Sequence, residues 1–257
     1  MTSPHDMRTT SALSVRSTGA VTTRVLTQLR RDHRTLAMLL VLPCALMTLL
    51  WWMFDGLPGN GFSSLGPALL ALIPFIIMFL VTSVTTLRER TSGTLERLLA
   101  MPMGKLDFLL GYAIAFGVVA AVQSALAVGL CVWVLDLTII GSTWMLMVVA
   151  VVDAVLGTAM GLFVSAFART EFQAVQFMPA VVIPQLLLCG LFVPRDQLPR
   201  TLEAISDVLP LSYAVDAMQK VASSTETGEV WGDIAIISAY VVAALALGAL
   251  TLRRQSA

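Results

Sequence analysis

Six long apolar stretches constrain this chain more than any other feature of its sequence. They run approximately over residues 36–54, 67–87, 109–135, 143–167, 174–193 and 231–252. A helix needs about 20 apolar residues to cross a hydrocarbon core about 30 Å thick, and these stretches have that length. Hydrophobic residues make up 57% of the 257 residues and charged residues only 12%, which argues against a soluble domain. The sequence therefore predicts an all-α membrane protein with six transmembrane helices in one bundle.

The basic residues are distributed unevenly between the two sides of these spans. If both ends of the chain lie in the cytoplasm, thirteen of the 16 Lys and Arg residues lie on the cytoplasmic side. Only Arg195, Arg200 and Lys220 then lie outside. Because cytoplasmic loops of membrane proteins carry an excess of Lys and Arg, the distribution predicts an N-in/C-in topology.

The region before the first span divides into two parts. Residues 1–20 lack periodic apolar content and are predicted to be a disordered leader, so that residues 21–257 form the single transmembrane domain. In residues 21–35, Val21, Val25 and Leu29 recur every fourth position among arginines. This pattern fits either a helix on the inner headgroup layer or a helical extension of the first span.

The loop after the second span has the pattern of a short amphipathic helix. Thr91 or Ser92 can cap it, Leu95 and Leu98 begin an apolar stripe, and Pro102 ends it. From the residues alone, two interpretations are equal. The stripe either docks on a partner, with its register fixed by charged side chains, or rests on the bundle as a connector. The charged side chains are Glu89, Arg90, Glu96 and Arg97.

A second unusual loop, residues 194–230, is too polar to span a membrane. Its apolar residues Leu198, Leu202, Ile205 and Leu209 have roughly helical spacing. Pro199 suits the first turn of one helix, Pro210 is expected to end it, and Ser212 to cap another that carries Tyr213, Met218 and Val221. The loop therefore predicts two short amphipathic helices on the outer surface.

Both loops, in this order, resemble those of type-2 ABC exporter permeases of the daunorubicin-resistance-like branch. In that family, the first loop is the coupling helix that sits on the ATPase, and the matching residues here are Glu89, Arg90, Gly93, Thr94, Leu95, Glu96, Arg97 and Leu98. The second loop resembles the external re-entrant helices, and its matching residues include Pro194, Pro199, Leu209, Pro210 and Tyr213. The resemblance covers nearly the whole chain.

The resemblance implies a permease subunit of an ATP-driven exporter in a bacterial inner membrane, an efflux system for a drug, lipid or glycolipid. A second permease chain, identical or related, and two ATPase subunits that bind ATP and Mg would complete it. The chain itself has no GxxxxGK[ST] loop, so no cofactor and no enzymatic activity are expected of it. The alternative is a secondary, ion-coupled transporter. Neither interpretation involves nucleic acid, and no set of catalytic residues or metal ligands is recognised.

Several residues within the spans are candidates for a polar site or a transport pathway. Asp153 lies near the middle of the fourth span, where it either hydrogen-bonds Gln123 or serves as a substrate or proton site. Pro74, Pro179 and Pro184 interrupt the second and fifth spans, and Gln176 or Gln185 is expected to satisfy a freed carbonyl. The resemblance places these two spans beside the transport route.

Small residues at four-residue steps predict where spans pack closely against a neighbour. The third span carries Ala113, Gly117, Ala121, Ala125 and Gly129 in this spacing, and the fourth carries Gly157, Gly161 and Ser165. Packing within one chain is preferred over a homodimer, because six helices have many internal contacts to make.

Overall fold

The computed structural model describes residues 14–54, 61–92 and 105–251, and its regular secondary structure there is entirely helical. Within these residues, six helices are long and apolar enough to cross a membrane. They are α2 (His33–Phe54), α3 (Gly61–Thr91), α5 (Lys105–Trp133), α6 (Thr143–Val164), α7 (Glu171–Leu188) and α10 (Gly228–Thr251). The predicted all-α bundle with six spans is therefore confirmed.

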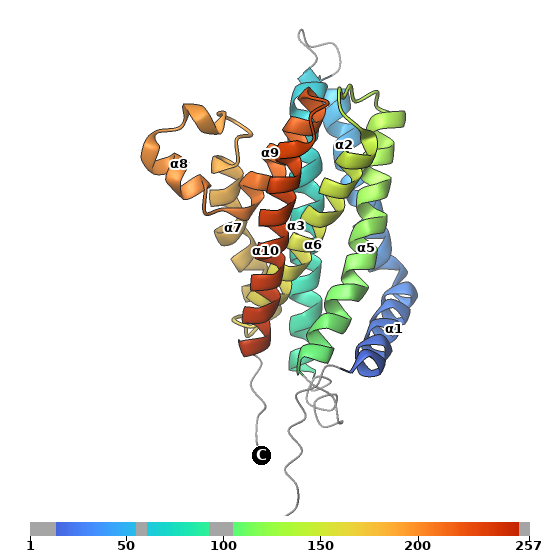
Figure 1. Cartoon of the computed structure of the whole chain (residues 1–257). Helices are drawn as coiled ribbons and strands as arrows, with labels where there is room; N and C mark the ends of the chain where they lie inside the picture. The colour runs from blue at the N-terminus through green and yellow to red at the C-terminus, as the bar shows by residue number, and fades with distance from the viewer. Residues whose placement is uncertain (1–13, 55–60, 93–104, 252–257) are drawn as a thin grey trace, which may run out of the picture.

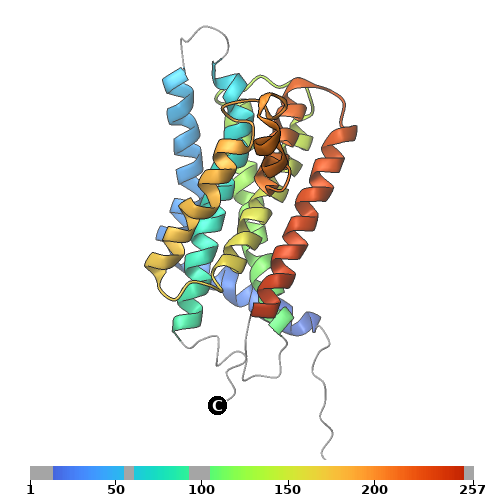
Figure 2. The same cartoon turned by 90° about the vertical axis from the view of Figure 1, so that its left-hand side faces the viewer.

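The shorter helices lie at the two ends of this bundle (Figures 1 and 2). At one end lies α1 (Val15–Arg31), together with the C-terminal end of α10. At the other end lie η1 (Arg195–Gln197), α8 (Arg200–Ser206) and the C-terminal end of α9 (Pro210–Ser223). These are called the α1 end and the α8 end below.

The central helices are α3, α5 and α6, and most of their apolar surface is buried, whereas α2, α7 and α10 are mostly exposed. Apolar side chains such as Met38, Trp52, Ile183 and Val242 form the outer surface. Helix α3 has 31 residues and is therefore about 46 Å long, well beyond a hydrocarbon core of about 30 Å. Its last turns consequently extend past the apolar part of the bundle.

The closest approach between two spans joins α3 to α6. A Cβ atom added to Gly157 would lie 2.5 Å from the carbonyl oxygen of Phe75, and one added to Gly161 would lie 2.5 Å from that of Phe79. Only residues without a side chain allow this contact between backbones. The predicted packing face of the fourth span is therefore confirmed, and it packs within the chain.

The corresponding prediction for the third span is wrong. The residues Ala113, Gly117, Ala121 and Ala125 are only half-buried, and they border the exposed stripe of Ile114, Val118, Val122 and Leu126. A Cβ atom added to Gly117 would meet nothing closer than 3.8 Å. Of the five predicted residues only Gly129 is buried. The buried face of α5 carries the large rings of Tyr112 and Phe116 and a different set of small residues, which includes Ala115, Ala120 and Ala127.

Helix α1 differs from both interpretations of residues 21–35. It ends at Arg31 and α2 begins at His33, so it is not an extension of the first span. Its apolar stripe of Val21, Val25 and Leu29 is buried against the bundle, mainly on α5, and is not free to enter a headgroup layer.

The start of α1 also corrects the predicted leader, because residues 15–20 are helical. The Ser14 side chain accepts a hydrogen bond from the Ser17 N–H, and the Ser14 N–H donates to Asp107 at 2.9 Å. Such a cap satisfies N–H groups that would otherwise lack partners at the start of a helix. Residues 1–13 lie outside the described part of the chain.

Of the two α-helices between α7 and α10, one is exposed and the other is buried in the bundle. Helix α8 is largely exposed, as predicted, but α9 is buried through Leu211, Ala214 and Met218 against α3, α6 and α10. Pro210 begins α9 and does not end α8, and Ser212 lies within α9 and does not cap it. Proline fits the first helical turn because its missing N–H has no partner to make there.

Candidate functional site

The last turn of α3 at the α1 end connects to three other helices through three consecutive residues. Glu89 is buried and accepts hydrogen bonds from Arg24 (3.0 and 3.2 Å) and from Gln28 (3.1 Å), both on α1. Arg24 and Gln28 are one turn apart, so they share one face of α1. Glu89 therefore fixes α1 to α3.

The residues on either side of Glu89 contact two more helices. Arg88 makes two hydrogen bonds with the Glu171 carboxylate at the start of α7, at 2.9 and 3.1 Å, and both side chains are exposed. Arg90 donates to the carbonyl oxygen of Ser165 at the end of α6, at 2.9 Å. Because these three residues lead directly into residues 93–104, we call Arg88, Glu89 and Arg90 the α3 hub.

This geometry refines the predicted docking residues. Glu89 and Arg90 form contacts inside the chain, Glu89 with α1 and Arg90 with the end of α6. The other predicted docking residues, Gly93, Thr94, Leu95, Glu96, Arg97 and Leu98, lie outside the described residues, and their role stays a prediction. The sequence did not indicate Arg24 or Gln28, because their partner is more than 60 positions away.

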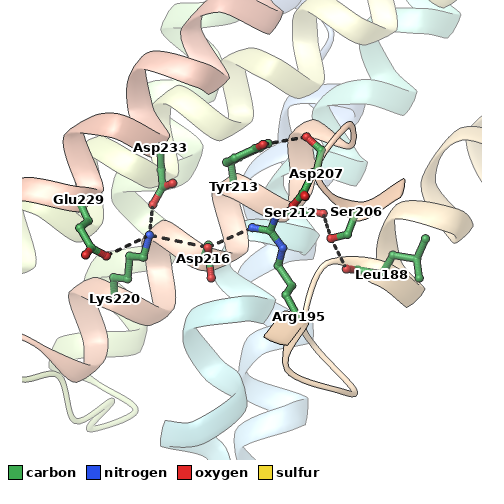
Figure 3. Close-up of polar contacts among 10 residues, drawn as sticks. All are labelled: Leu188, Arg195, Ser206, Asp207, Ser212, Tyr213, Asp216, Lys220, Glu229 and Asp233. Carbon is green, nitrogen blue, oxygen red and sulfur yellow. Dashed lines mark hydrogen bonds and ion pairs between the residues drawn. The ribbon is translucent and has the colours of Figure 1, made fainter. Parts of the chain in front are cut away.

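The α8 end contains a network of charges shown in Figure 3. Arg195, in η1, bonds Asp207 between α8 and α9 (2.5 Å) and Asp216 within α9 (3.1 Å). The Arg195 guanidinium also lies over the ring of Tyr213, 5.2 Å from its centroid, and the Tyr213 hydroxyl donates to the Asp207 carbonyl at 2.7 Å. These contacts fix η1 and α8 to α9.

Lys220 continues this network to α10. Its Nζ lies 2.9 Å from Asp233 and 3.6 Å from Glu229, both on α10, and 3.7 Å from Asp216 on its own helix. Burial of Lys220 lowers its pKa. The hydrogen bond to Asp233 and the neighbouring carboxylates raise the pKa by more than burial lowers it, so the net shift is upward. Lys220 therefore stays charged at neutral pH. Asp216 is shared by Arg195 and Lys220, and it joins the two halves of the network.

Neutral polar contacts join the end of α7 to the start of α9. The Gln185 side chain donates to the Val181 carbonyl at 3.0 Å and accepts from the Leu211 N–H at 3.3 Å. The Ser206 hydroxyl contacts the Leu188 carbonyl (2.8 Å) and the Ser212 hydroxyl (3.0 Å), as Figure 3 shows. Gln185 therefore caps the first turn of α9. The carbonyl that Pro184 leaves without a backbone donor is that of Ala180, so the bond to Val181 is not the one that the sequence predicted.

The predicted external residues take positions at the borders of the short helices. Pro194 precedes η1, Pro199 precedes α8, and Leu209 precedes α9, which Pro210 begins. Tyr213 is half-buried in the network.

The predicted intramembrane residues do not form one site. Asp153 of α6 and Gln123 of α5 are both fully buried, but within the described residues neither side chain has a hydrogen-bond partner, so the predicted bond between them is absent. Pro74 is buried in α3, whereas Pro179 and Pro184 lie on the exposed side of α7. The side chain that does join α5 to α6 is Ser124, which donates to the Ala150 carbonyl at 3.0 Å.

Fold and site together define a multi-pass helical membrane protein whose charged networks lie at its two ends. A family model for the ABC-2 type transporter matches residues 16–222, which take in the region from α1 to α9 except for its first and last residues. The chain therefore belongs to the ABC-2 type family of ABC transporter membrane proteins, as the resemblance of its two loops indicated.

Its relatives include several named permeases. The chain is 26% identical over 155 residues to "Probable multidrug ABC transporter permease YbhR" of Escherichia coli K12, which covers 60% of this chain and 42% of YbhR. It is 28% identical over 147 residues to "Inner membrane transport permease YhhJ" of the same strain, covering 57% and 39% of the two chains. It is 24% identical over 194 residues to "ABC transporter G family member 20" of Dictyostelium discoideum, covering 74% and 27%. The chain thus aligns with less than half the length of these relatives.

Proposed function

We propose that this chain is the permease subunit of an ATP-driven exporter in a bacterial inner membrane. Two ABC ATPase subunits would bind ATP and Mg, and a second permease chain, identical or related, would complete the transport route. Membership of the ABC-2 family supports the ATPase partner. The names of two E. coli relatives support an amphiphilic, drug-like substrate and an inner-membrane location.

The observation that carries this proposal is the α3 hub. Arg88, Glu89 and Arg90 follow one another in the chain, yet they bond α7, α1 and α6 in turn. A displacement of residues 93–104 by a partner would therefore act on three helices at once through one rigid helix end. This is the arrangement that coupling to ATP hydrolysis requires.

The secondary-transporter alternative rests on Asp153, the buried carboxylate in the middle of α6. Ion coupling generally uses several ionisable groups that face one another inside the bundle. Asp153 has no hydrogen-bonding or ionic partner within the described residues. The ATP-driven exporter is therefore the better supported function.

The decisive experiment measures substrate-stimulated ATP hydrolysis by the reconstituted complex with charge-reversed variants Glu96→Lys and Arg97→Glu. A like charge facing an interface commonly costs several kcal/mol, so we expect stimulation to fall while membrane levels stay unchanged. Arg200→Glu is the matched control, because Arg200 is exposed at the opposite end of the bundle. Unchanged stimulation in both variants would remove residues 89–101 from the coupling path, and failure of any ATPase to co-purify would overturn the exporter itself.

The proposed orientation has its own test. In a background without Cys44, Cys131 and Cys189, single cysteines at positions 60 and 225 should react with an impermeant thiol reagent added outside the cell. A cysteine at position 94 should react only after the membrane is permeabilised. The reverse pattern would invert the topology and, with it, the side on which an ATPase could dock.

A further inference from the structure

The α1 end contains a cavity whose lining includes Arg88 and Glu89 of the α3 hub, and the proposed function assigns no ligand to it. It has a volume of about 340 Å³ and lies where α1, α2, α3 and α5 meet. Since a water molecule occupies about 30 Å³ of liquid, this space holds on the order of ten water molecules, which is enough for a small ligand group.

The charged residues that line the cavity are balanced in sign. Arg24 and Arg88 contribute positive charge, and Asp32 and Glu89 contribute negative charge. Hydrogen bonds from the Thr35 side chain and backbone lower the pKa of Asp32, which therefore stays ionised at neutral pH. Arg24 is paired with Glu89, and Arg88 is paired with Glu171, which lies outside the lining. The lining therefore carries no net charge, and it suits a polar ligand that is neutral overall, such as a zwitterion.

Donor groups in this lining remain available for a ligand. Arg24 bonds Glu89 through Nη2, but its Nη1 atom is buried and has no hydrogen-bond partner within the described residues. A buried guanidinium N–H without an acceptor is unfavourable, and a phosphate oxygen is among the strongest acceptors that an arginine can find.

The depth of the cavity points to the membrane as the source of the ligand. Its rim includes Asp32 and Thr35 at the start of α2 and Arg88 near the end of α3, so it lies where two spanning helices leave the apolar layer. About one turn further along α2, Met38 and Val41 are exposed apolar side chains. A headgroup in the cavity would therefore have a surface for its acyl chains directly beside it.

We propose that this cavity binds the headgroup of a zwitterionic phospholipid of the phosphatidylethanolamine type, with the phosphate toward Arg24 and Arg88 and the ammonium toward Asp32 and Glu89. The bound lipid fills the junction between α1 and the spanning helices. This site does not depend on the ATP-driven export proposed above, because it needs only that α2 and α3 cross a bilayer.

The test is native mass spectrometry of the full chain, released from detergent in the presence of phosphatidylethanolamine, phosphatidylglycerol or soluble phosphoethanolamine. We expect one phosphatidylethanolamine per chain, bound about tenfold or more tightly than phosphatidylglycerol, because a charge-assisted hydrogen bond contributes roughly a tenfold change in affinity. Equal binding of the two lipids would overturn the zwitterion assignment. Soluble phosphoethanolamine binding as tightly as the lipid would show a solute site and overturn the membrane source.

Two variants connect that binding to the cavity. Thr85 lines the cavity, so Thr85→Phe should fill it and weaken phosphatidylethanolamine binding about tenfold or more. The matched control is Thr23→Phe, because Thr23 is exposed on the outer side of α1 and does not line this cavity. If Thr85→Phe does not fold, Arg88→Gln at the rim should weaken binding severalfold. Wild-type affinity in a folded Thr85→Phe or Arg88→Gln protein would place the lipid elsewhere and overturn the proposal.

Discussion

The two ends of the bundle hold their charges in different ways. At the α1 end, the pairs Arg24–Glu89 and Arg88–Glu171 join residues 65 and 83 positions apart, and each carboxylate serves a single arginine. At the α8 end, Arg195 and Lys220 share Asp216, and the carboxylates that the two cations contact lie 4 to 21 positions away. The α1 end thus contains separate ion pairs between distant segments. The α8 end is a local network in which each cation contacts more than one carboxylate.

This difference bears on which end tolerates the loss of a contact. A cation in the network at the α8 end can turn to another carboxylate, whereas within the described residues Arg24 pairs with Glu89 alone. The α1 end should therefore be the more sensitive to single substitutions. The following four predictions test this comparison, in order of decreasing effect on stability.

The largest effect is expected from Gly157→Ala, at the close contact between α6 and α3, the helices that connect the two ends. The added Cβ would lie 2.5 Å from the Phe75 carbonyl oxygen, and neither backbone can move away without shifting α3 against α6. Overpacking of this kind costs typically 1–3 kcal/mol, and we expect about 3 kcal/mol or more here. The control Gly117→Ala has open space at 3.8 Å and should change the thermal midpoint in detergent little. Equal thermal midpoints in the two variants would show that the close contact between α3 and α6 does not hold the two ends together.

The α1 end is tested directly by Glu89→Leu, which leaves Arg24 and Gln28 without their acceptor. Breaking a buried pair costs about 3–5 kcal/mol, and because the Arg24 side chain is one-third exposed we expect about 2–3 kcal/mol. Glu171→Gln breaks an exposed, solvent-screened pair and should change stability little. Chemical unfolding in detergent measures both, and a smaller loss for Glu89→Leu than for Glu171→Gln contradicts the comparison.

The α8 end is tested by Asp216→Asn, which removes the carboxylate that Arg195 and Lys220 share. Because Asp207 and Asp233 remain as partners, we expect a loss of only about 1 kcal/mol in the same unfolding assay. Glu229→Gln, at the most exposed carboxylate of the network, should be close to neutral. A loss as large as that of Glu89→Leu would mean that the network is not redundant.

The smallest effect is expected at Asp153, between the two ends. Because neither of its oxygens has a partner within the described residues, Asp153→Leu should leave stability unchanged or raise it by up to about 1 kcal/mol, and Asp153→Asn should be neutral. Unfolding and transport are measured together. Lost transport with unchanged stability would assign Asp153 a functional role, and a clear loss of stability in Asp153→Leu would show a hidden partner.

The spans and the order of the two unusual loops were predictable because both are local properties of the sequence. An apolar stretch needs no distant partner to be recognised, whereas the role of a proline at a helix border was less certain, since Pro210 begins α9 and does not end α8. The packing face of α6 was also predictable, since Gly157 and Gly161 have the spacing that close backbone contact requires.

What the sequence could not show depends on contacts between distant segments. Val21 packs where Gly111 leaves room, with a distance of 2.6 Å to an added Cβ, and this pairing decides that α1 covers α5 and not the membrane surface. The burial of α9 likewise depends on α3, α6 and α10, although its own pattern suits a surface helix equally well. Polar residues such as Glu89 appear available in a sequence until their partners are known.

The anchoring of Ser14 has a practical consequence for work with this protein. Its N–H group bonds Asp107 in the first turn of α5, so the chain before residue 14 leaves the molecule beside the start of that helix. An affinity tag or a fluorescent protein fused ahead of residue 14 would emerge next to the connection between α3 and α5, where the ATPase is proposed to bind. Placing the fusion in the 224–227 turn between α9 and α10 would put it at the other end of the bundle and keep that surface clear.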